Sequence, residues 1–276
     1  MLSTVQHVRQ LATRHEHFKY GLSTLHAWIR LFECIVHIGY RKDLKKWQIR
    51  RVADKEALQK RAAEVKQKFW ERMHIHVDQP RSGGKGSSND GNTARRDFKD
   101  DVTFAAVTGV DQELVHRMHV ILQTMSSGCA IDVPAFDAYC AMTADLYVEL
   151  YPWYPMPAAV HKVLIHGAAV VESLVLPIGM LSEDAQESRN KDFRAYRLQH
   201  TRKDSRLHTM ADQFGYLLVT SDPLISSSCV GEYCRRAQER VRFAPEALAL
   251  LKGDVTSGSV ALSADSTMET DSSDDD

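Results

Sequence analysis

Apolar residues recur at helical spacing along most of this chain, and no segment alternates convincingly between apolar and polar residues as a strand would. The clearest case runs from residue 23 to residue 40. Its apolar positions, which return every three or four residues, are Leu25, Trp28, Phe32, Ile35 and Val36. Ser23 precedes them as a cap. The pattern predicts a buried amphipathic helix.

The same spacing predicts further helices on both sides of a glycine- and serine-rich stretch. Asp43, Asp111 and Asp132 are positioned as helix caps, and Pro157 suits the first turn of a helix. The expected helical segments are 43–72, 94–127, 132–151, about 157–173, about 182–200 and about 209–220. The sequence therefore predicts a mainly α fold.

Composition divides the chain into five parts. Residues 78–93 are rich in Gly, Ser and Asn, which predicts a loop. Residues 254–276 hold seven acidic residues and no basic one, which predicts disorder. The expected parts are a basic helical region (1–77), the loop (78–93), a helical domain (94–225), a C-terminal segment (226–253) and the acidic tail (254–276).

Charge is distributed unevenly along the chain. Residues 1–100 contain 21 Lys and Arg against 11 Asp and Glu, whereas the remaining residues contain 14 against 25. A basic body with an acidic tail is typical of a protein that binds a polyanion. It is more often typical of a solvated helical surface followed by a disordered end, because Lys- and Arg-rich helices are common. The charge alone leaves both interpretations open.

Cysteine usage and hydropathy restrict the compartment. The five cysteines are an odd number at irregular spacings, which favours free thiols in a reducing, intracellular compartment. No run of about 18 apolar residues occurs, so neither a membrane-spanning helix nor a membrane partner is expected.

Two segments carry residues suited to metal and DNA chemistry. The first, HKVLIHG at 161–167, places His161 and His166 five residues apart. About 140° separates such positions on a regular helix, so the two imidazoles do not share a face unless Gly167 lets the helix end. In that case both could reach one zinc ion. A pair of ordinary packing histidines is the alternative.

The second segment, 182–206, surrounds Glu187 with basic residues. Such cations can hold DNA phosphates, and a carboxylate among them can hold Mg²⁺. A surface helix of ion pairs is the alternative interpretation. The basic residues are Arg189, Lys191, Arg194, Arg197, Arg202, Lys203 and Arg206.

These stretches resemble a known family. HKVLIH at 161–166, ESRNKDFRAYR at 187–197 and RKDSR at 202–206 are similar to the end of the catalytic core of Transib transposases and of the V(D)J recombinase catalytic subunit. Weaker matches are Leu25-His26 and DGNTARR at 90–96. The resemblance spans roughly residues 20–225. It implies the helical C-terminal portion of an RNase H-like DDE core, without the catalytic sheet.

The resemblance also implies roles for individual residues. In that family an HK-x-L-x-H element supplies two histidines of a structural zinc site, which correspond to His161 and His166 here. An ES-x-NK-x-FR element supplies the third acid of the DDE centre, which corresponds to Glu187 and implies a ligand of Mg²⁺ or Mn²⁺. Glu183, one helical turn earlier, is the competing candidate.

The chain departs from the family where the other ligands belong. The family's two catalytic aspartates and its CxxC pair lie upstream of the matched segment, and no CxxC occurs here. Cys229 and Cys234 have four residues between them and follow the histidines instead of preceding them. One carboxylate of three cannot hold two metals for in-line attack. We therefore expect incomplete magnesium and zinc sites and no catalysis by this chain alone.

Three functional hypotheses are consistent with these sequence features. The first is a transposase-derived DNA-binding fragment or domesticated transposon protein. The second is part of an active Mg-dependent DDE transposase or recombinase whose missing residues lie upstream. The third is a non-catalytic protein-interaction module. We expect DNA as the partner and the nucleus as the location, which the pairs Arg41-Lys42 and Lys45-Lys46 also suggest. A homodimer and a protein partner stay open.

Overall fold

The computed structural model describes residues 22–80, 87–222, 224–225 and 243–253. They form two compact units: the first extends to Ser182 and resumes at Phe243, and the second begins at Glu183. Within the described ranges every regular element is a helix, and the pairing Pro80–Ser87 and the pairing Ile131–Leu251 are isolated bridges. The expected mainly α fold is confirmed.

The first unit holds most of the described helices. They are α2 (Thr24–Arg41), α3 (Val52–Met73), α4 (Gly91–Lys99), α5 (Asp101–Thr108), α6 (Gln112–Ser126), α7 (Val133–Leu150), α8 (Ala158–Ser173), the 3-10 helix η2 (Ile178–Leu181) and α12 (Pro245–Ala249). The second unit holds α9 (Asp184–Gln199) and α10 (Arg206–Thr220).

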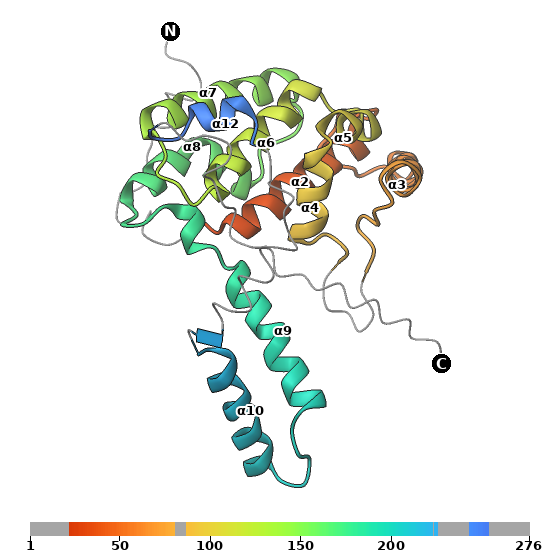
Figure 1. The fold of residues 1–276 in the computed structure, drawn as a ribbon. Coiled ribbons are helices and arrows are strands. Elements are labelled where there is room, and N and C mark those ends of the chain that lie inside the picture. Colours follow the sequence, from red (N-terminus) through yellow and green to blue (C-terminus); the bar gives the residue numbers. More distant parts are fainter. Residues whose placement is uncertain (1–21, 81–86, 223, 226–242, 254–276) are drawn as a thin grey trace. The chain divides into compact units, whose positions relative to one another are not determined.

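Helix α2 is the centre of the first unit. It packs against α3, α4, α5, α6 and α8, and Figure 1 shows it in red among them. Its fully buried side chains are Leu31, Phe32, Ile35, Val36 and Ile38. Burying each of these side chains contributes roughly 1.5–3 kcal/mol of transfer free energy. The expected buried helix over 23–40 is therefore confirmed.

Aromatic rings join α2 to its neighbours. Phe104 on α5 stacks on Phe32 with ring centroids 5.6 Å apart, and it meets Phe98 edge-on at 5.2 Å. α2 and α5 also approach closely at Gly39, where a Cβ atom would lie 2.9 Å from the carbonyl oxygen of Thr108. Only glycine allows this separation of the two helices.

Three of the expected caps are confirmed. Ser23, Asp111 and Asp132 each accept a hydrogen bond from the backbone N–H three residues later. This bond satisfies a donor that the first turn of a helix leaves unpaired.

The expected helix over 43–72 with Asp43 as its cap is wrong in its first part. α3 begins at Val52, and Lys45 has a left-handed backbone with φ of 49°. The Asp43 carboxylate lies 3.6 Å from the Arg61 side chain instead of capping a helix. The chain therefore turns between α2 and α3.

Other boundaries shift for local reasons. The segment 94–127 is divided because Asp100 caps α5 and Gly109, with φ of 74°, ends it. α10 begins at Arg206 rather than at 209, since Ser205 accepts a hydrogen bond from the N–H of His208. The expected disordered tail, 254–276, lies outside the described residues.

The aromatic cluster gives a direct stability test. Phe104→Ala should lower the free energy of unfolding by about 3–5 kcal/mol, because it removes a fully buried ring and leaves a cavity. Val102→Ala on the same helix is the matched control, since Val102 is 55% exposed. Urea denaturation measures both variants, and equal losses would contradict the assigned packing.

Candidate nucleic-acid interface

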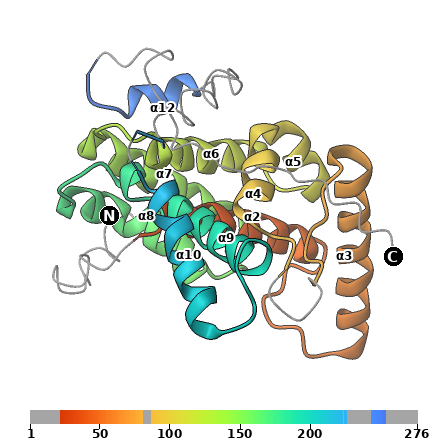
Figure 2. The same ribbon diagram turned by 60° about the horizontal axis from the view of Figure 1, so that its bottom comes forward.

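Helices α9 and α10 lie side by side as an antiparallel hairpin (Figures 1 and 2). The ring of Tyr196 stacks on that of Tyr216 with centroids 5.4 Å apart. Gln213 is buried, and its Nε2 donates to the backbone carbonyl of Phe193 at 2.9 Å. Aromatic stacking and a buried amide therefore hold the inner faces of the two helices together.

Three of the seven expected DNA-binding cations hold the hairpin itself. Arg189 donates to the carbonyl of Leu217 at 3.1 Å and to the Thr220 hydroxyl at 2.8 Å. Arg202 binds the Asp212 carboxylate through two side-chain nitrogens, at 3.0 and 2.8 Å. Lys203 donates to the carbonyl of Arg197, which spans the turn. Arg202 and Lys203 stabilise the chain reversal, and Arg189 joins the open ends of the two helices.

The other four cations are available to a partner. Lys191, Arg194, Arg197 and Arg206 are all exposed. None of their four side chains has a hydrogen bond or ion pair with another described residue, although the backbone carbonyl of Arg197 accepts from Thr201 and Lys203. They are the residues of this set that could contact phosphates without first breaking an internal bond.

Two of these cations share a face with Glu187. Lys191 follows Glu187 by four residues, and Arg194 follows three residues later, so the three point to one side of α9. Arg189 and Tyr196, which contact α10, lie on the other side of the helix. The spacing therefore directs Glu187, Lys191 and Arg194 away from α10.

The hairpin is electrostatically polarised along its length. Its loop half, residues 193–214, holds five basic and two acidic residues. Its open half, residues 183–192 with 215–222, holds two basic and five acidic residues. The whole hairpin is neutral, and the excess of positive charge lies at the loop end.

Glu187 is exposed in the first turn of α9, where the positive end of the helix dipole favours a carboxylate. The competing candidate, Glu183, is the N-cap residue of the same helix. Among the residues that the structure describes, no three His, Cys, Asp or Glu side chains gather closely enough to hold a metal ion. The described side chains therefore do not form the full ligand set that the resemblance implies.

The two histidines do meet, contrary to the geometric expectation. Their ring centroids are 5.1 Å apart although α8 continues through Gly167 to Ser173. Side chains on a helix lean toward its N-terminus, which carries His166 back toward His161. Partial burial lowers the pKa of His161 and so favours the neutral ring. Cys229 and Cys234 lie outside the described residues.

A buried acid was missed by sequence reasoning. Asp97 on α4 is completely buried, and neither of its carboxylate oxygens has a hydrogen-bond partner among the described residues. Burial raises its pKa to about 8, although Arg96 acts in the opposite direction. The available signal was its helical spacing with Ala94 and Phe98, which places Asp97 on the buried face of α4.

A partly buried histidine, His119, lies on α6. Burial lowers the pKa of His119 to about 4, against an increase caused by the Asp101 carboxylate. The His119 ring stacks on Phe98, with centroids 5.9 Å apart. Asp97 and His119 are therefore both neutral near pH 7; Asp97 lies in the core and His119 at its edge.

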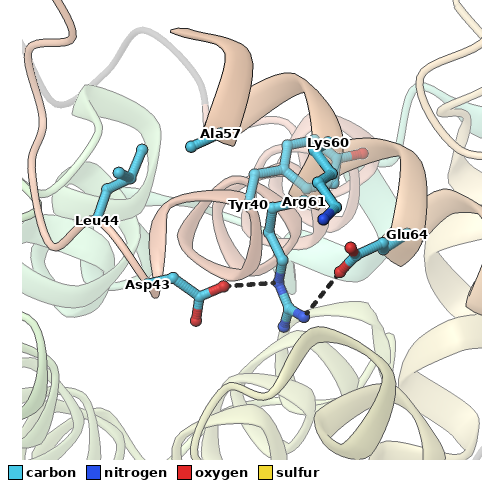
Figure 3. Close-up of a pocket in the computed structure, with 7 residues that line it drawn as sticks. All are labelled: Tyr40, Asp43, Leu44, Ala57, Lys60, Arg61 and Glu64. Carbon is cyan, nitrogen blue, oxygen red and sulfur yellow. Dashed lines mark ion pairs between the residues drawn. The ribbon is translucent and has the colours of Figure 1, made fainter. Parts of the chain in front are cut away.

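The concave site in Figure 3 is lined by residues of α2, α3 and the turn between them. Arg61 is its central cation and lies 3.6 Å from the Asp43 carboxylate and 3.8 Å from that of Glu64. Its guanidinium also donates to the backbone carbonyls of Gly39 and Thr108. Arg61 therefore joins α3 to α2 and α5 and is not left for an anionic ligand.

Comparison with known proteins adds no relative. No protein-family model and no curated protein sequence matches this chain. In the part of the chain that the structure describes, none of the helices has the length and apolar character needed to cross a membrane.

Asp97 predicts an unusual pH dependence. The unfolded carboxyl ionises near its ordinary pKa of 3.8, whereas the folded one stays protonated up to about pH 8. The stability contributed by the neutral acid is therefore lost as pH rises through this range. His119 acts oppositely, but only between about pH 6.5 and 4. A comparison of pH 6.5 with pH 8 therefore separates the Asp97 effect from that of His119.

Between pH 6.5 and 8, ionisation of Asp97 should lower the free energy of unfolding by roughly 2 kcal/mol. Asp97→Asn should remove the fall, because the amide does not ionise. Urea denaturation across the pH range measures it. A wild-type protein as stable at pH 8 as at pH 6.5, or a variant with an unchanged profile, would show that Asp97 is not buried in this way.

The histidine pair predicts weak zinc binding. Two imidazoles leave half of a tetrahedral shell to water, so the purified chain should retain far less than one zinc per molecule. Metal analysis by mass spectrometry measures this. A stoichiometric zinc that disappears in both His161→Ala and His166→Ala would instead establish a complete site with further ligands.

Proposed function

We propose that this chain is a DNA-contacting protein derived from a transposase of the Transib and V(D)J recombinase class, and that it is not catalytically competent alone. The proposal rests on the resemblance over residues 161–206 together with one structural observation. Four of the seven cations in the matched segment, Lys191, Arg194, Arg197 and Arg206, are exposed, and their side chains have no hydrogen bond or ion pair with other described residues.

The outer face of α9 is the proposed contact surface. Lys191 and Arg194 are about 4.5 Å apart along the helix axis and project to one side. Guanidinium and ammonium groups at such a spacing can bind neighbouring phosphates, which displaces condensed counterions from the DNA. No base-reading contact is proposed, so binding is expected to depend on salt and only weakly on sequence.

The proposed ancestry places these helices in the C-terminal portion of an RNase H-like DDE core. Glu187 would then be the remaining acid of a three-acid centre. Its position between the exposed cations and the positive end of α9 supports that role. Glu187 supplies one of the three acids that two-metal catalysis requires, so nuclease activity is not proposed for this chain alone.

A salt series measures the proposed contact. The purified chain should bind a fluorescent random-sequence duplex with an affinity that falls steeply with salt. Four phosphate contacts correspond to a slope of log affinity against log salt of about −3.6. An absence of binding at low salt would remove the DNA role and favour the protein-interaction module.

The double variant Lys191→Gln/Arg194→Gln should reduce that slope by about 1.8, since each phosphate contact contributes about 0.9. Arg96→Gln/Lys99→Gln is a matched control, because it removes two exposed cations at the same spacing on α4. The control should leave the slope within about 0.5 of the original. An equal loss in both variants would show that general charge, not the α9 face, binds the DNA.

A further inference from the structure

Helix α10 carries an apolar face that the hairpin does not bury. Leu207 is 76% exposed, Met210 58%, Phe214 63% and Leu218 58%. The intervals of three, four and four residues place these side chains on one side of the helix. We refer to these four residues as the α10 stripe. Contiguous apolar surface of this kind marks an interaction site in soluble proteins.

The contacts of α10 with α9 use a different side of the helix. Gln213, Tyr216 and Thr220 supply the amide, ring and hydroxyl that meet α9. The α10 stripe is therefore not needed to hold the hairpin. Its side chains are turned away from these inner-face residues by about 60–180° around the helix.

The order of the stripe residues is symmetrical. Leu207 and Leu218 are its ends, and Met210 and Phe214 are its middle. If two copies pack antiparallel, each leucine of one helix faces the opposite leucine of the other, and each Met210 faces a Phe214. Such a self-complementary surface fits the two-fold symmetry of a homodimer.

Charge complementarity favours the same arrangement. The loop half of the hairpin holds five basic and two acidic residues, whereas the open half holds two basic and five acidic residues. Antiparallel packing of two hairpins places the basic loop half of each beside the acidic open half of the other. Parallel packing would place like charges together, which is unfavourable. Antiparallel α10 helices also oppose their dipoles favourably.

We propose that the occupant of the α10 stripe is a second copy of this chain, joined as an antiparallel two-fold dimer through α10. The two hairpins then form a four-helix bundle in which the stripes of both copies make the central apolar contact. The proposal does not depend on DNA binding. It leaves the outer face of α9, with Lys191 and Arg194, free for a phosphate partner.

Sedimentation velocity of the full chain tests the dimer. The wild type should be dimeric at about 100 µM, a concentration suited to an interface of modest size. Phe214→Glu should raise the dimer dissociation constant by about 100-fold or more, since each interface would bury two unpaired carboxylates. Circular dichroism should show an unchanged helix content, because Phe214 is exposed in the single chain.

Val219→Glu is the matched control. Val219 is 57% exposed on the same helix, about 140° around it from Phe214. The control should change the dissociation constant by less than about threefold. A monomeric wild type would overturn the proposal, including the case in which another part of the same chain covers the stripe. Equal effects of both variants would overturn the assignment to the stripe.

Disulfide cross-linking tests the orientation. In a background with Cys129, Cys229 and Cys234 replaced by serine, a mixture of Leu207→Cys and Leu218→Cys chains should form a cross-linked dimer. Neither variant alone should do so, because the like positions lie about 16 Å apart along the bundle. Cross-linking of Leu207→Cys with itself would demonstrate a parallel dimer and contradict the antiparallel arrangement.

Discussion

The burial of α2 against five other helices is the interaction on which the first unit depends. Its apolar side chains fill the space between α3, α4, α5, α6 and α8, and Gly39 lets the backbone of α5 approach within contact distance. Polar groups are used sparingly there. The indole of Trp28 donates to the Ser126 hydroxyl at 2.8 Å, which orients α2 relative to α6. The neutral Asp97 and His119 are tolerated in this core at a cost that depends on pH.

The hairpin of α9 and α10 depends on polar contacts more than on apolar burial. It has little apolar core of its own, so hydrogen bonds hold it: those of Arg202 and Lys203 at the chain reversal and those of Arg189 at the open end. These cations differ from Lys191 and Arg194, whose exposed side chains have no hydrogen bond or ion pair with other described residues. The hairpin also leaves the apolar stripe of α10 exposed. The proposed phosphate-contacting face and the proposed dimer face therefore use different side chains of two adjacent helices.

Local features of this fold could be predicted from the sequence, and features that depend on distant residues could not. Ser23, Asp111 and Asp132 cap helices because the required N–H lies three residues away. Asp43 looks like a cap as well, but its partner is Arg61 across a turn that no local pattern reveals. The sequence identified seven cations around Glu187, yet only the folded hairpin shows which of them are engaged. The approach of His161 to His166 depends on side-chain direction, which spacing alone does not give.

The central claim is that the exposed cations of α9, rather than basic charge in general, make the DNA contact. Lysine acetylation of the chain with and without duplex DNA, read by mass spectrometry, tests this residue by residue. We expect DNA to protect Lys191 from acetylation. Lys99 on α4 and Lys55 on α3, which are also exposed, should be acetylated as they are in the free protein. Protection of Lys55 or Lys99 without protection of Lys191 would contradict this claim and move the interface to the first unit.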